Sequence, residues 1–269
     1  MRGIYSDISN KDYHEIEAIS ASGMKLLRRT PAHYKCSLHE ETPALKTGSA
    51  LHCAVLEPER FSLEYIEAPD IDKRTKEGKK AFAELEASGK IALTKEEYTN
   101  VTGMAKSIHS HEIAGQLVIG GRAEHSIFWD KNILLNGGAE VAVPCKARPD
   151  FIKESDGCYH IIDIKTAEDA RPYAFTRAAY DYGYHIQAAH YFNGCTSILD
   201  MPVGEFAFIV VEKKPPYAVV VYVANQDFMN VGQSQCSQLI SLYAKCSAED
   251  KWPAYTDEII ELGVPAWAK

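Results

Sequence analysis

The sequence predicts an α/β (α+β) fold, in which a mixed central β-sheet is flanked by helices. Three observations predict it. Apolar residues recur at helical spacing through roughly the first 110 positions, β-rich runs follow in the middle, and helical and β-rich segments then alternate toward the C-terminus. The order helices, strands, helices, strands, helix is typical of a sheet covered by helices.

Capping residues and apolar spacing place the helices of the N-terminal part. A serine cap precedes the first helix, and Thr94-Lys95-Glu96-Glu97 forms a capping box at the start of another. Residues 67–90 are predicted to be an exposed linking region that becomes helical. The predicted helices begin at Ser20 or Ser22, at Leu45 and at Thr94, and they end near Thr30-Pro31, Leu56 and Ser110.

Runs rich in β-branched and aromatic residues place the strands in the second half of the chain. The predicted strands are Ala123 to Trp129, Val141 to Ala147, Tyr159 to Lys165, Phe206 to Glu212 and Tyr217 to Ala224. Two helices are predicted between the third and fourth strands, near 170–180 and 185–195. A last helix covers about 226–246.

Length and composition favour one domain. The 269 residues suit a helical N-terminal part at about 15–110, a catalytic core at about 120–225 and a C-terminal helix at about 226–246. No run of about 18 apolar residues occurs and the N-terminus lacks the apolar stretch of a signal peptide, so we expect a cytoplasmic protein without a membrane partner. Seven cysteines without a CxxC pair predict buried reduced thiols rather than a zinc or iron–sulfur site.

One predicted hairpin brings acidic residues together. Asp156-Gly157 is a strong two-residue turn signal, because a type I′ turn needs positive φ at both central positions. Counting outward from this turn sets Asp150 directly opposite Asp163 on the same sheet face, with Cβ atoms about 5 Å apart. Lys165 shares that face because strand side chains alternate. The turn rule therefore gathers two carboxylates and a lysine.

This group has the composition that phosphodiester hydrolysis requires. Two carboxylates so close repel each other unless a cation lies between them, and their oxygens are ligands that Mg²⁺ prefers. A cation held there polarises a phosphoryl oxygen and lowers the pKa of a bound water, while a lysine stabilises the developing charge. We therefore expect Mg²⁺ as the cofactor, with Mn²⁺ as a substitute. The alternative is a surface hairpin with a salt bridge between Lys165 and an aspartate.

Pro149-Asp150 followed by Asp163-Ile164-Lys165 resembles the signature of the PD-(D/E)xK nucleases. Gln187-Ala188-Ala189-His190-Tyr191 is similar to the QxxxY motif of their RecE-like, lambda-exonuclease-like and RecB- or Cas4-like members. The signature of these nucleases allows either aspartate or glutamate at the position of Asp163. The four-cysteine pattern of some Cas4-like relatives is missing, which favours the RecE-like branch.

Further segments occur in the order of that family, so the resemblance covers about 15–225 of the chain. Gly48-Ser49-Ala50-Leu51-His52 resembles an upstream helix that contributes a histidine, and Ala123 to Trp129 resembles a strand that contributes a glutamate, here Glu124. Two segments near the N-terminus resemble the start of RecE-like nuclease domains: Ile19 to Lys25 and Thr30 to Tyr34.

The resemblance implies a role for each matching residue. Asp150 and Asp163 would be the central metal ligands, completed or supported by His52, Glu124 and the Ile164 carbonyl. Lys165 would act on the nucleophilic water or on the transition-state charge, and Gln187 and Tyr191 would support the site. Simpler alternatives are a core histidine at His52, a cross-strand pair of Glu124 with Arg122 or Lys146, and a plain core role for Tyr191.

The resemblance also implies a substrate and partners. It implies an exonuclease that degrades double-stranded DNA from its ends, 5′ to 3′, and leaves 3′ single strands for a RecT-like annealing protein. Such enzymes form homo-oligomeric rings, so the net charge of −8 requires basic residues to line a channel. Rival hypotheses are a single-strand exonuclease, an endonuclease and a non-catalytic DNA-binding protein. Candidate DNA contacts are Arg171, Arg177, Lys79 and Lys80; a solvated helix face is the competing explanation and is favoured for the lysines.

Overall fold

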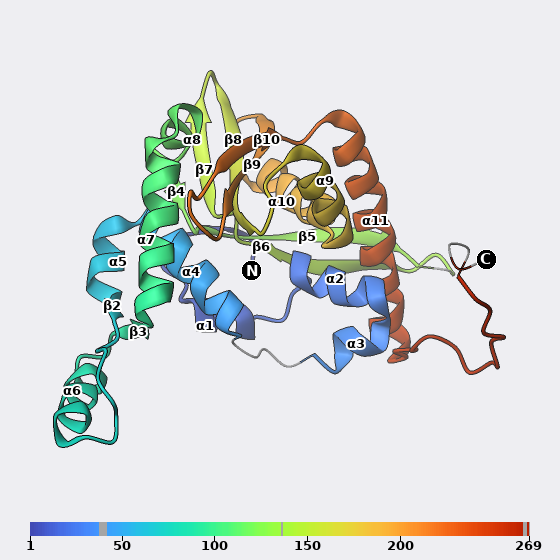
Figure 1. The fold of residues 1–269 in the computed structure, drawn as a ribbon. Coiled ribbons are helices and arrows are strands. Elements are labelled where there is room, and N and C mark those ends of the chain that lie inside the picture. Colours follow the sequence, from blue (N-terminus) through green and yellow to red (C-terminus); the bar gives the residue numbers. More distant parts are fainter. Residues whose placement is uncertain (38–41, 136, 266–267, 269) are drawn as a thin grey trace.

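The computed structural model describes residues 1–37, 42–135, 137–265 and 268. Its centre is a five-stranded sheet with the strand order β10-β9-β8-β7-β4 (Figure 1). Strands β8 and β9 run parallel and the other neighbours run antiparallel, which confirms the predicted mixed sheet. The strands are β4 (Gly121–Ala123), β7 (Phe151–Ser155), β8 (Cys158–Ala167), β9 (Val203–Glu212) and β10 (Val219–Val223).

Two smaller sheets stand beside the central one. An antiparallel sheet has the order β1-β5-β6, with β1 at Gly3–Tyr5, β5 at Ser126–Leu134 and β6 at Glu140–Ala147. A parallel pair joins β2 (Tyr65–Glu67) to β3 (Ile91–Leu93).

The predicted single strand from Ala123 to Trp129 is wrong. The chain ends β4 at Ala123 and starts β5 at Ser126, and these two strands belong to different sheets. Between them, Glu124 takes a positive φ of 52° and its backbone N–H donates to the backbone oxygen of Asp150, 3.0 Å away. This turn redirects the chain from the central sheet to the smaller antiparallel one.

Two helices of the N-terminal part begin where the sequence predicts, after Ser20 and Thr94, whereas the helix predicted from Leu45 begins at Pro43 and four short helices were not predicted. The Ser20 side chain accepts from the backbone N–H of Gly23, and Thr94 and Glu97 form the capping box of α7. Helix α6 lies in an excursion between β2 and β3, apart from the remaining elements (Figure 1). The helices are α1 (Asn10–Glu15), α2 (Ala21–Arg29), α3 (Pro31–Lys35), α4 (Pro43–Leu56), α5 (Pro58–Glu64), α6 (Lys76–Ala87), α7 (Lys95–Ser110) and α8 (Glu112–Leu117).

Two hydrophobic cores cover the two faces of the central sheet. Helices α9 (Pro172–Asp181) and α10 (Tyr184–Ile198) follow β8 in the chain, and α11 (Gln226–Glu249) follows β10. Ile161 of β8 packs in the core that includes α10 and α11, whereas Ile162 and Ile164 pack in the core that includes α4 and α7. Because side chains alternate between the two faces of a strand, Asp163 and Lys165 face the side of the sheet that α10 covers. Among the described residues, no helix has the length and hydropathy that a bilayer crossing requires.

Candidate active site

The β7–β8 hairpin has the predicted turn and register. Asp156 and Gly157 have φ values of 52° and 73°, as a type I′ turn requires. Phe151 pairs with Ile162, so the next position outward sets Asp150 against Asp163. The carboxylate of Asp150 lies at the end of this ladder, where its Oδ2 accepts from the backbone N–H of Ile164 at 2.7 Å.

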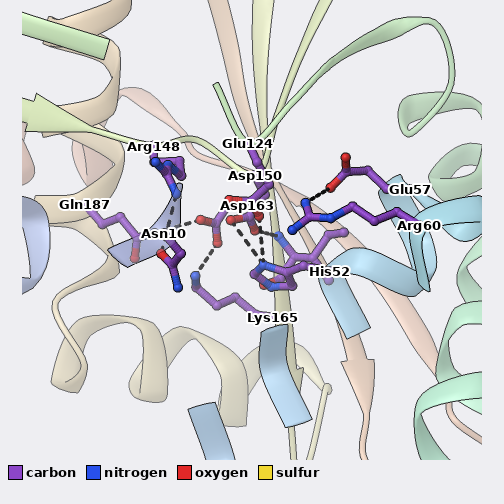
Figure 2. A network of polar contacts seen from close by, with 11 residues as sticks. Asn10, His52, Glu57, Arg60, Glu124, Arg148, Asp150, Asp163, Lys165 and Gln187 are labelled. Carbon is purple, nitrogen blue, oxygen red and sulfur yellow. Dashed lines mark hydrogen bonds and ion pairs between the residues drawn. The ribbon is translucent and has the colours of Figure 1, made fainter. Parts of the chain in front are cut away.

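Asp163 is fixed from two sides. It is fully buried, and its Oδ1 accepts from Gln187 Nε2 at 2.7 Å while its Oδ2 lies 2.5 Å from Lys165 Nζ. Lys165 Nζ also lies 4.9 Å from the centre of the Tyr184 ring, within range of a cation–π contact. Gln187 belongs to α10, so this helix holds the acidic strand and its lysine together (Figure 2).

A second group of ligand atoms lies next to that pair. His52, Glu124 and Asp150 each offer one atom, and the three atoms lie within 4.8 Å of one another. His52 Nδ1 is 3.4 Å from Asp150 Oδ1 and 3.6 Å from Glu124 Oε1. These residues come from α4, the turn before β5 and the position just before β7, and Figure 2 shows them converging with Asp163. Glu124 therefore contacts His52, while the alternative partner Lys146 donates to the backbone oxygens of Tyr13 and Ile16.

The chemistry of these atoms suits a divalent cation. His52 Nε2 lies 3.1 Å from the backbone oxygen of Ile164, which can only accept, so Nε2 carries the proton. The Nδ1 atom then faces two carboxylate oxygens, and this contact is favourable only with a second proton on Nδ1 or a cation between the three atoms. One imidazole and two carboxylates can hold a divalent cation; the carboxylate oxygens suit Mg²⁺ and Mn²⁺, whereas the imidazole suits Zn²⁺ and Fe²⁺. The Ile164 carbonyl, the other predicted ligand, faces the His52 ring.

Burial and close charges shift the pKa values of this group. Burial raises the pKa of Asp163 to about 6, against the opposing effect of Lys165, and burial also raises the pKa of Asp150. Burial alone would lower the pKa of His52, but Asp150 and Glu124 outweigh it and raise the pKa to about 9. Protons therefore compete with a metal ion for these atoms, and a bound cation would displace them.

One supporting residue was not predicted from the sequence. Lys25 of α2 donates to Gln187 Oε1 at 3.1 Å, and its Nζ lies 5.0 Å from the centre of the Tyr184 ring. Tyr191 is half-buried beside Phe206, as the QxxxY spacing suggests for the face of α10 that carries Gln187. Lys25 lies inside the segment Ile19 to Lys25 that was singled out, but nothing in that segment indicates its distant partner.

The predicted DNA-contact residues lie on the surface. Arg171 contacts Asp169 at 2.6 Å, Arg177 contacts Asp181 at 3.7 Å, and Lys80 contacts Glu84 at 3.8 Å. Lys79 is exposed on α6, which Figure 1 shows apart from the central sheet. The structure does not gather these four side chains with the acidic group.

A mixed sheet whose hairpin presents two aspartates and a lysine beside a helix-borne glutamine defines the PD-(D/E)xK class. The sequence model of the family described as "PDDEXK-like domain of unknown function (DUF3799)" matches residues 20–262, and the chain belongs to this family. The match confirms the resemblance and supports a hydrolytic nuclease.

A solved structure shares the fold. A candidate exonuclease from Eubacterium rectale is similar with a TM-score of 0.61 at 12% sequence identity, over 97% of this chain and 97% of that one. The structure of SSO0001 gives a TM-score of 0.37 at 11% identity over 89% of this chain and 80% of that one, a score too low to indicate a shared fold. None of the curated proteins matches the sequence.

Proposed function

We propose that the protein is a Mg²⁺-dependent exodeoxyribonuclease that degrades double-stranded DNA from its ends, 5′ to 3′. One observation carries the proposal: ligand atoms of His52, Glu124 and Asp150 lie within 4.8 Å of one another, beside the pair of Asp163 and Lys165. The fold shared with a candidate exonuclease supports action at DNA ends over internal cutting.

Each residue has a defined task in this proposal. His52, Glu124 and Asp150 would hold the cation, with Asp163 beside them. A bound Mg²⁺ supplies a polarised phosphoryl oxygen and an acidic water. Lys165, held by Asp163 at 2.5 Å, would donate to the charge that develops on the phosphate in the transition state. Gln187 keeps Asp163 turned toward Lys165 by binding its other oxygen.

The biological setting belongs to the same proposal. Degradation from 5′ ends would leave 3′ single strands, the substrate of a RecT-like annealing protein. A homo-oligomeric ring that encloses the duplex would let basic residues line a channel although the chain has a net charge of −8.

The test is a time course with linear duplex DNA labelled at either the 5′ or the 3′ end, with closed circular DNA alongside. Each reaction is run with Mg²⁺ and with EDTA, and with Asp163→Asn and the exposed control Asp257→Asn. Mg²⁺-dependent loss of the 5′ label, with circles intact and only Asp163→Asn inactive, supports the proposal. Earlier loss of the 3′ label contradicts the polarity. Cut circles indicate an endonuclease, and intact DNA throughout indicates a binding protein.

A further inference from the structure

Lys25 reaches the active site from a distant part of the chain. It lies on α2, whose neighbouring residues Met24 and Leu27 are buried in the core beside α10 and α11. Its ammonium donates to Gln187 Oε1 at 3.1 Å, across 162 positions of sequence. Because Gln187 accepts from Lys25 through its oxygen, its amide nitrogen is the group left to donate to Asp163.

The two lysines form a pair around one aromatic ring. Lys25 Nζ lies 5.0 Å and Lys165 Nζ lies 4.9 Å from the centre of the Tyr184 ring. Asp163 contacts Lys165 at 2.5 Å, whereas Lys25 has no carboxylate oxygen within 4.0 Å among the described residues. Lys165 is thus paired with a carboxylate, whereas Lys25 has no direct carboxylate partner in this half-buried site.

An ammonium without a carboxylate partner is costly in a half-buried site unless an anion binds it. Burial and, after it, repulsion from Lys165 lower the pKa of Lys25 to about 8, against the attraction of Asp163. An ammonium has three donors, and Lys25 uses one of them for Gln187. A phosphodiester oxygen offers the charge and the acceptor that the other donors lack.

We infer that Lys25 is a second active-site lysine, which donates to a non-bridging oxygen of a DNA phosphate while it holds the amide of Gln187. The inference rests on the proposed nuclease function and deepens it. Lys165 and Lys25 would then contact the same DNA strand. The DNA-contact residues expected from the sequence, which lie on the surface, are not needed for this contact.

The test compares Lys25→Met and Lys25→Arg with Lys106→Met, which removes the same charge from an exposed position on α7. Single-turnover cleavage of linear duplex is measured in Mg²⁺. Duplex binding is measured against salt concentration with Ca²⁺ in place of Mg²⁺. We expect Lys25→Met to slow cleavage by about 10²-fold and to reduce the slope of log affinity against log salt by about one. Lys25→Arg restores most of the rate, and Lys106→Met behaves as the wild type.

The outcomes separate the two proposals. If the wild type leaves DNA intact, the proposed function fails before Lys25 is tested. If the wild type is active and Lys25→Met matches it, the inference is wrong and the nuclease stands. If Lys25→Met is slow but keeps the wild-type salt slope, Lys25 acts only through Gln187 and the phosphate contact is wrong. Thermal melting identifies any variant that is unfolded. If Lys25→Met is unfolded, the rate and salt slope of Lys25→Arg test the inference.

Discussion

The Nε2 atom of His52 lies 3.1 Å from the backbone oxygen of Ile164, which ties α4 to the strand that carries Asp163 and Lys165. The contact fixes which ring nitrogen faces Asp150 and Glu124. Ile164 packs in the core beneath α4 and α7, so the contact joins the strand to the helix that covers this face of the central sheet.

Replacement of His52 by glutamine should weaken metal binding, because one of the three ligand atoms is lost. We expect the affinity for Mn²⁺ to fall at least about tenfold. The rise in melting temperature that excess Mn²⁺ gives the wild type should shrink in parallel, since a ligand that binds only the folded state stabilises it by mass action. Calorimetric titration measures the affinity, with His33→Gln as the control. An unchanged affinity would remove His52 from the metal site.

Replacement of Lys165 by methionine should stop cleavage and leave the fold intact. The side chain keeps its length but loses the ammonium 2.5 Å from Asp163. We expect the single-turnover rate to fall about 10³-fold, because a donor to developing charge is lost, while duplex affinity changes less than about tenfold. Quench-flow kinetics and filter binding measure the two quantities. A rate within tenfold of the wild type would contradict the role of Lys165.

His190 should make the protein sensitive to acid. It is fully buried, its Nε2 lies 3.0 Å from the backbone oxygen of Lys146, and burial lowers its pKa to about 4. The unfolded chain gains this proton near pH 6.5 and the folded protein does not. The stabilisation is therefore present above pH 6.5 and is lost as the pH falls toward 4, by up to about 1.4 kcal/mol per pH unit.

Urea unfolding between pH 4 and 7 measures this effect as the difference between the wild type and His190→Gln. The difference is needed because Asp163 acts in the opposite direction. Burial raises its pKa to about 6, so its contribution to stability is lost as the pH rises through that value. Equal slopes for the wild type and the variant would show that His190 titrates alike in the folded and unfolded chains.

Two helical glycines should respond oppositely to alanine. A Cβ at Gly232 of α11 would lie 2.1 Å from the backbone oxygen of His185, so the α10–α11 contact must open. A Cβ at Gly48 of α4 would meet nothing within 4 Å. We expect Gly232→Ala to lower the free energy of unfolding by about 1–3 kcal/mol and Gly48→Ala to raise it by about 0.5–1 kcal/mol. Urea denaturation measures both free energies of unfolding. If both substitutions changed this free energy in the same direction, the result would contradict the packing described here.

The sequence predicted the parts of the site that depend on local rules. The Asp156-Gly157 turn, strand alternation and the four-residue spacing of Gln187 and Tyr191 act over short separations, and the hairpin register follows from them. The signals for helix starts are also local, because the side chains of Ser20 and Thr94 accept from backbone N–H groups in the first turns of their helices.

The parts that were missed depend on distant contacts. The break at Glu124 follows from a hydrogen bond to Asp150 and from the change of sheet. Neither feature can be predicted from the β-rich run of residues around Glu124. The place of Lys25 depends on how α2 packs near α10, so its partner Gln187 could not be inferred from spacing. The division of the strands between separate sheets is likewise a tertiary outcome.

The Asp156-Gly157 turn lies five residue pairs from Asp150, a span of roughly 17 Å along β7. One inserted residue in that strand would send the Asp150 side chain to the opposite face, whereas two inserted residues would return it to its own. Insertions of odd and even length in β7 should thus differ in their effect on activity even where both leave a folded protein. Length variation among natural relatives is then expected in the turn, in steps of two in the strand, and hardly at all by single residues.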